Sequence, residues 1–203
     1  MQFGCDPDFD AYEARQRPAI DVAKVGMQRF AAGHFHVGYD TSTVPPDIMA
    51  KFLDLSLGLS TLHLDKQGAR RQFYGVPGLF RAKPYGVEYR TLSNFWLRST
   101  LDTGGEGTFL SYLARGCVDL AERAQNDTVS LRELYRVCPW ADVKTAIETE
   151  NVEMGRKILD FMHGLDPGLF RFPCAIMEWK EAAPTDYNKL VSKKSKAAYI
   201  QVR

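Results

Sequence analysis

The sequence lacks several features that identify common classes of protein. Its four cysteines lie far apart and include no C-x-x-C pair, so neither a zinc knuckle nor a dense disulfide framework is predicted. No apolar run approaches the roughly 20 residues that span a membrane, and the acidic, polar first residues do not resemble a secretory signal. The formal net charge is only +1, which argues against a nucleic-acid partner. We therefore expect a cytoplasmic protein without a membrane partner.

Two common catalytic signatures are missing as well. The sequence has neither a G-x-S-x-G nucleophile elbow nor a Walker-type G-x-x-x-x-G-K-[ST] loop, so it does not predict a serine hydrolase or a P-loop nucleotidase. What remains is the composition of an ordinary globular protein, with 45% hydrophobic and 25% charged residues in a chain of 203. That length allows one substantial domain and a second, small one.

The first motif of interest is a short strand that carries two histidines. Residues 33–39, GHFHVGY, alternate in strand fashion, so His34 and His36 are expected to share one face. Imidazole binds divalent transition metals and donates hydrogen bonds to phosphate, and Gly33 leaves room for a ligand to approach the backbone. Taken alone the motif is weak, because two half-buried histidines on an edge strand would give the same pattern.

The second motif is a run of basic and aromatic residues between positions 70 and 90. Glycine and proline predict a loop over 65–79, and a hairpin follows with its turn at 83–86. Guanidinium groups bind the oxygens of phosphates and carboxylates in pairs, and Glu88 would offer Mg²⁺ a hard oxygen ligand. Salt bridges within the loop, or an RNA-binding face, would produce the same composition. The basic members are Arg70, Arg71, Arg81, Lys83 and Arg90.

The overall pattern predicts an α+β fold. An antiparallel sheet carries both motifs and is packed by helices, and a mainly helical C-terminal part follows. One strand is expected after Phe170. Helical periodicity covers residues 48–62, 107–124, 131–137, 141–148 and 152–162.

Three aspartates near the start of the chain allow two interpretations. Asp6, Asp8 and Asp10 are spaced two residues apart, so a strand would direct their carboxylates to one face and toward a metal site. The sequence Asp-Pro-Asp is also typical of a turn, which is the simpler interpretation.

Three segments together resemble the phage-type carboxylate–amine ligase family, a branch of the glutamine-synthetase-like fold. They read FGCDPDFDAY, AAGHFHVGYD and RRQFYGVPGLFRAKPYGVEYRTLSNFWL, and the resemblance extends over residues 3–100. It implies a partial glutamine-synthetase-like sheet in a catalytic domain at 1–125, followed by a helical extension and basic tail at 126–203. The implied activity is ATP-dependent amide formation through an acyl phosphate, in the host cytoplasm if a phage encodes the protein.

The resemblance also implies roles for the matching residues. His34 and Glu88 would ligate the metal, with Mg²⁺ as the expected ion and Mn²⁺ as the alternative. Arg81 would bind the transferring phosphoryl group, and Arg90 would neutralise the acyl phosphate. The residues expected to bind the phosphates of ATP are His36, Arg70, Arg71 and Lys83.

In this family a further N-terminal region supplies strands with metal-binding carboxylates, and here the sequence begins at the FGCDPDF-like segment. Three explanations stay open: a partner chain supplies those strands, the sequence is a fragment, or the protein has lost catalysis. The alternative function is that of a catalytically inactive or split-chain remnant acting as a binding or assembly protein. The expected substrates are small-molecule or peptide carboxylates and amines, and ring assembly in relatives suggests a homo-oligomer.

Overall fold

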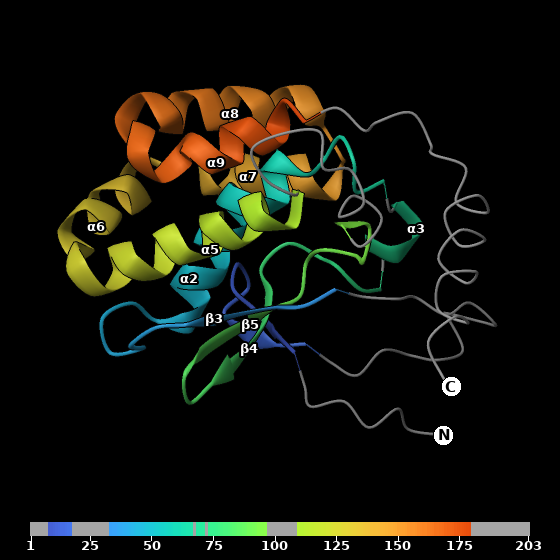
Figure 1. The fold of residues 1–203 in the computed structure, drawn as a ribbon. Helices are drawn as coiled ribbons and strands as arrows, with labels where there is room; N and C mark the ends of the chain where they lie inside the picture. The colour runs from blue at the N-terminus through green and yellow to red at the C-terminus, as the bar shows by residue number, and fades with distance from the viewer. Residues whose placement is uncertain (1–7, 18–32, 67, 72, 97–108, 180–203) are drawn as a thin grey trace, which may run out of the picture.

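The structure, a computed structural model, describes residues 8–17, 33–66, 68–71, 73–96 and 109–179. Over these residues it confirms the predicted α+β class, with an antiparallel sheet on one side and a layer of helices on the other (Figure 1). Asp6 and Pro7 of the Asp-Pro-Asp segment and the predicted basic tail from residue 180 lie outside the described residues. The division at residue 125 stays a prediction.

The sheet is small, and the hairpin predicted from the sequence lies at its centre. Within the described residues five short strands pair in the order β2-β1-β4-β5-β3, and every pair is antiparallel. Gly86 begins β5 with a φ of 146°, and a Cβ there would lie 2.0 Å from the carbonyl oxygen of Val37, so the turn requires glycine. The strands are β1 (Phe9–Asp10), β2 (Arg15–Gln16), β3 (Phe35–Gly38), β4 (Leu79–Lys83) and β5 (Gly86–Tyr89).

The helix predicted at 48–62 is confirmed and packs directly on the sheet. Helix α2 (Pro46–Leu53) starts with Pro46, whose missing N–H costs nothing at a helix start, and it contacts β4 and β5. It continues into a π-helical turn, η1 (Asp54–Gly58), in which every residue is buried. Single π turns are often found at functional or constrained positions. Here the turn brings Asp54 against β5, where Tyr89 donates a hydrogen bond to its carboxylate.

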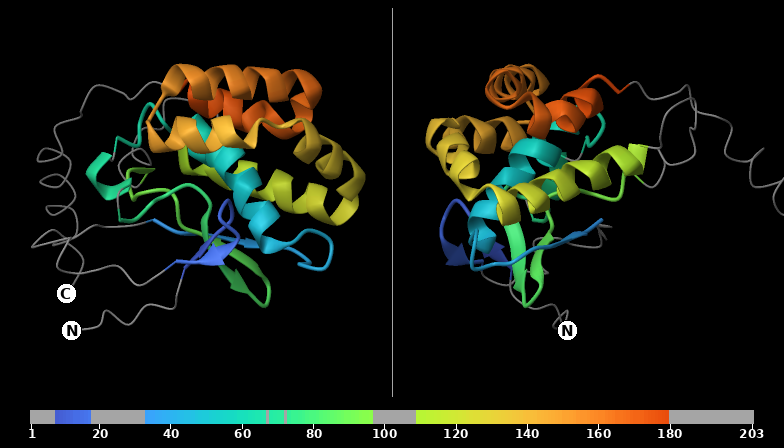
Figure 2. Two further views of the ribbon diagram at one scale, coloured as in Figure 1. Left: turned by 180° about the vertical axis from the view of Figure 1, so that it is seen from behind. Right: turned by 60° about the vertical axis from the view of Figure 1, so that its left-hand side comes forward.

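The C-terminal helices form the second layer (Figures 1 and 2). Helix α9 packs on both α5 and α8, and both α5 and α7 contact η1. Asp127, Asn151 and Asp166 each accept a backbone N–H at a helix start, which is why α6, α8 and α9 begin where they do. The helices are α3 (Gly68–Arg71), α5 (Phe109–Asn126), α6 (Thr128–Val137), α7 (Trp140–Glu148), α8 (Val152–Leu165) and α9 (Pro167–Met177).

The strand predicted after Phe170 does not form in the described residues up to 179, because residues 167–177 form α9. Asp166 caps the helix by accepting the N–H of Leu169 at 3.0 Å, and Pro167 occupies its first turn. Phe170 and Ile176 are fully buried in the core. The buried residues Leu169, Pro173 and Ile176 have the i, i+4, i+7 spacing of one helix face. Capping and core packing thus outweigh the local preference of a short aromatic run for strand.

The two faces of the sheet carry different side chains. Val87 and Tyr89 of β5 are fully buried against the helices. Because side chains alternate along a strand, Glu88 and Arg90 lie on the opposite face. That polar face contains the candidate site.

Candidate functional site

A row of polar side chains crosses the sheet on the face opposite the helices. His36 pairs with Glu88 between β3 and β5, and Glu88 pairs with Arg81 between β5 and β4. The register of β1 with β4 continues to Asp8, which then lies opposite Arg81. Directly opposed residues in antiparallel strands project to the same face, with Cβ atoms about 5 Å apart. The strand order therefore brings residues from four separate segments into one row.

Glu88 is the centre of a charged cluster. Its Oε1 accepts a hydrogen bond from Arg90 Nη1 at 2.5 Å and lies 3.5 Å from Arg81 Nη1, while Oε2 lies 3.2 Å from Lys83 Nζ. Burial favours a higher pKa for Glu88, but the hydrogen bonds and charges of Arg90, Lys83 and Arg81 outweigh it and lower the pKa. The residue is 4% exposed, so an ionised carboxylate is held among three cations.

Asp8 supplies the second carboxylate of the cluster. Its Oδ1 lies 2.9 Å from Arg81 Nε and 3.0 Å from Arg90 Nε. Within the cluster, three cations thus face two carboxylates, so these five side chains carry a net charge of +1. The sequence interpretation placed Asp8 in a turn, yet the two-residue spacing from Asp10 was the signal of a strand that directs both side chains to one face.

His34 lies beside this cluster. Its Nδ1 is 3.1 Å from Glu88 Oε1 and 3.2 Å from Arg90 Nη1. Burial and the charge of Arg90 lower the pKa of His34 against the opposing effect of Glu88, which favours the neutral imidazole. Two ligands of one cation, bound at about 2.1 Å and at right angles, lie about 3 Å apart, which is close to the separation of His34 and Glu88. Within the described ranges, however, no group of three or more His, Cys, Asp or Glu side chains is arranged to hold a metal ion.

His36 lies at the rim of the row. Its Nδ1 is 2.6 Å from the hydroxyl of Tyr85, a residue in the β4–β5 turn that is 51% exposed. The pair presents a ring nitrogen and a phenol to solvent next to the charged cluster. Both groups are therefore available to a ligand that binds along the row.

Arg70 and Arg71 lie elsewhere and hold the loop before β4. Arg70 is 2% exposed and donates to two backbone carbonyls that follow β5, at 3.0 and 2.9 Å. Burial lowers its pKa to about 10, so it still carries its charge. Arg71 lies 3.5 Å from Asp65 Oδ2 and 3.3 Å from Glu150 Oε1. The structure does not bring these two arginines into the row; ligand binding by either would first have to break these contacts.

The loop held by Arg70 predicts a strong effect of one glycine substitution. Gly75 has a φ of 69°, and a Cβ there would lie 2.0 Å from Arg70 Nη1 and 2.6 Å from the carbonyl oxygen of Thr91. Gly75→Ala is expected to lower the free energy of unfolding by about 2 kcal/mol, measured by urea denaturation. Gly68→Ala is the control, because nothing lies within 4 Å of a Cβ at that position. Equal stability of the two variants would contradict this account of the loop.

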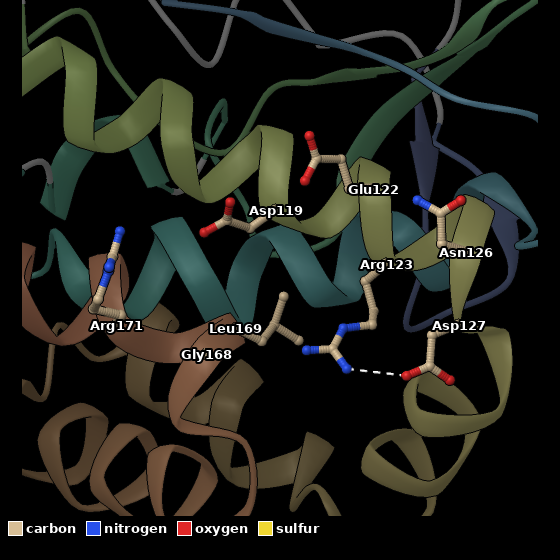
Figure 3. Close-up of a pocket in the computed structure, with 8 residues that line it drawn as sticks. All are labelled: Asp119, Glu122, Arg123, Asn126, Asp127, Gly168, Leu169 and Arg171. Carbon is tan, nitrogen blue, oxygen red and sulfur yellow. Dashed lines mark hydrogen bonds and ion pairs between the residues drawn. The ribbon is translucent and has the colours of Figure 1, made fainter.

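A separate polar cleft of about 430 Å³ opens between α5 and α9 (Figure 3). Arg123 crosses it and lies 3.0 Å from Asp127 and 2.8 Å from Asp166, so its guanidinium group is already paired. Figure 3 shows Asp119 and Glu122 on α5 as further acidic members of the lining. The cleft thus lacks the net positive charge of the cluster on the sheet face.

A sheet face on which three cations surround two carboxylates is suited to binding an oxyanion together with a metal cation. Comparison with known families points the same way: residues 23–111 match the family described as phage phiEco32-like COOH.NH2 ligase type 2. This confirms the predicted resemblance to phage-type carboxylate–amine ligases for the central part of the chain, which contains both motifs. The name of the matched family describes a carboxylate–amine ligase, and the match covers less than half of the chain. The first segment of the predicted resemblance, around residues 3–12, lies outside the matched residues.

No match is found among curated proteins or among solved structures. In the part of the chain that the structure describes, no helix combines the length and apolar character needed to cross a membrane.

Proposed function

We propose that this protein is an ATP-dependent ligase that joins a carboxylate to an amine through an acyl phosphate. The observation that carries the proposal is the cluster of Arg81, Lys83 and Arg90 around Glu88, with His34 beside it. The family match over residues 23–111 supports the same reaction class. The substrates are proposed to be small-molecule or peptide carboxylates and amines.

The donors of Arg81 fit a phosphate ligand. Its Nη2 is buried and has no hydrogen-bond partner among the described residues. A buried N–H without a partner costs free energy, and a phosphate oxygen would recover that cost through a charge-assisted hydrogen bond. Lys83 is 25% exposed at its side chain, so its ammonium group is accessible to the same ligand.

His34 and Glu88 provide two protein ligands for the divalent cation that the proposed reaction needs. His34 and Glu88 would hold a divalent ion, Mg²⁺ or Mn²⁺, as its two donors from the described residues. Mg²⁺ commonly binds through one or two protein ligands and completes its coordination with water and phosphate oxygens. When bound, the ion would neutralise charge on the phosphates during transfer.

The proposed reaction needs neutralisation of charge rather than a nucleophile from the protein. A carboxylate oxygen attacks the γ-phosphorus of ATP, the bond to ADP breaks, and the amine then attacks the acyl carbon and displaces phosphate. Arg81 and Lys83 would bind the transferring group, and Arg90 would hold the acyl phosphate in position. His36 would contact the phosphates from the rim. Arg70 and Arg71 would contribute indirectly, by holding the loop that precedes β4.

Titration calorimetry with Mg-ATP tests the proposal. The wild type is expected to bind, and Arg81→Ala is expected to weaken binding about tenfold, because one charge-assisted contact is lost. Arg132→Ala, which removes an exposed arginine of α6, is the matched control and should bind like the wild type. Circular dichroism would establish that each variant is folded.

Absence of Mg-ATP binding in the wild type would overturn the proposed function. Binding that Arg81→Ala leaves unchanged would place the nucleotide elsewhere. Binding without amide formation in the presence of carboxylates and amines would favour the alternative of a non-catalytic remnant.

A further inference from the structure

Asp8 occupies the space between two guanidinium groups. Its carboxylate oxygen Oδ1 lies within 3.0 Å of both Arg81 Nε and Arg90 Nε, whose side chains are 13% and 7% exposed. A carboxylate between two arginines resembles, in charge and size, an oxygen of a bound phosphate or of a substrate carboxylate. The arrangement therefore has the chemistry of an anion site with an internal anion in place.

The ion pairs of Asp8 are short but poorly directed. Among the described residues, Asp8 Oδ1, Arg81 Nε and Arg90 Nε make no well-aligned hydrogen bond, and Arg81 Nη2 makes none either. Hydrogen bonds weaken steeply when the N–H does not point at the acceptor. An oxyanion free to orient itself would make the hydrogen bonds that the side chain of Asp8 cannot.

The backbone at Asp8 is fixed, so only its side chain needs to move. The carbonyl oxygen of Asp8 accepts the N–H of Arg17 at 2.8 Å, and the next residue begins β1, which pairs with β4. The side chain of Asp8 is 16% exposed, which leaves it a path toward solvent. Rotation about its side-chain bonds would free both guanidinium groups without unfolding the strand.

We propose that the space between Arg81 and Arg90 is an oxyanion seat, occupied by Asp8 in the ligand-free protein and vacated when a phosphate or carboxylate ligand binds. Asp8 then acts as an internal competitor. Its carboxylate neutralises part of the charge of the two arginines. Ligand binding is therefore weaker, because the ligand has to displace this carboxylate. The inference rests on the proposed function for the identity of the natural ligand.

Calorimetry with inorganic pyrophosphate, without metal or nucleotide, tests the seat itself. Asp8→Asn removes the competing charge and keeps the shape, and it is expected to tighten pyrophosphate binding about tenfold. Asp8→Ser is a second variant with the same expectation. Asp40→Asn is the matched control: it removes the same charge from an exposed side chain that accepts the N–H of Ser42, and it should leave affinity unchanged.

Succinate, titrated in parallel, distinguishes the two sources of the oxyanion. A larger gain for pyrophosphate in the Asp8 variants assigns the seat to a phosphate, and a larger gain for succinate assigns it to the substrate carboxylate. Unchanged or weaker binding of both probes in Asp8→Asn and Asp8→Ser overturns the inference. A gain with pyrophosphate in a protein that does not bind Mg-ATP would refute the ligase proposal and leave the seat standing.

Discussion

Replacing Asp54 with alanine is expected to lower the free energy of unfolding by about 3 to 5 kcal/mol. Asp54 is fully buried in η1, and its carboxylate accepts hydrogen bonds from Tyr89 Oη at 2.7 Å, from Thr91 Oγ1 at 2.9 Å and from the N–H of Gly78. Alanine would leave a small cavity and deprive these buried donors of their acceptor. Urea denaturation measures the change.

Asp40→Ala is the control for this experiment, because Asp40 is an exposed carboxylate that accepts one backbone N–H. Its removal is expected to cost about 1 kcal/mol or less. A similar small loss for Asp54→Ala would show that the buried network contributes little to joining the helices and the sheet.

The ionisation of Asp54 adds a dependence on pH. Burial raises its pKa to about 7, although the hydrogen bonds of Tyr89 and Thr91 oppose that change. A carboxyl whose pKa is higher in the folded state gives stability that is fully present below the pKa of the unfolded chain and is lost as pH rises through about 7. The free energy of unfolding of the wild type should therefore fall relative to that of Asp54→Asn as the pH rises from 4 to 8. An unchanged difference across that range would contradict the assignment.

Glu88→Gln is expected to abolish the effect of Mg²⁺ on ATP binding. Glu88 is the carboxylate that contacts Arg81, Lys83 and Arg90, and with His34 it forms the proposed cation site. Glutamine keeps the size but loses the charge that a divalent cation requires. We expect Mg²⁺ to tighten ATP binding to the wild type by about a hundredfold and to have little effect on the variant.

The comparison needs a titration of ATP with and without Mg²⁺ for each protein. Glu13→Gln is the matched control, because Glu13 is exposed and pairs with Lys144 at 2.9 Å, away from the row. It should show the wild-type dependence on Mg²⁺. If Glu88→Gln retains that dependence, the cation binds to other residues.

The parts of the fold that the sequence predicts correctly are those set by local chemistry. The β4–β5 hairpin follows from glycine in its turn, and α8 follows from helical spacing. The strand expected after Phe170 does not form up to residue 179, because the local pattern of an aromatic run does not reveal how Phe170 packs against the core. Burial of that kind depends on residues far away in the sequence.

The candidate site shows the same division. The alternation along β5 was sufficient to direct Glu88 and Arg90 to one face. It could not distinguish Arg81, which joins the row, from Arg70, whose donors are held by backbone carbonyls of a distant segment. Asp8 joins the row because of the register of β1 with β4. The spacing of residues along one strand does not predict its register with a distant strand.

Amide hydrogen exchange with and without Mg-ATP tests the central claim most directly, because it locates the ligand without a substitution. The account predicts slower exchange in β3, β4 and β5, the strands that carry His36, Arg81 and Glu88, and no change in α5 and α9 around the polar cleft of Figure 3. Protection confined to α5 and α9, or no protection at saturating Mg-ATP, would contradict the claim that the charged sheet face binds the nucleotide.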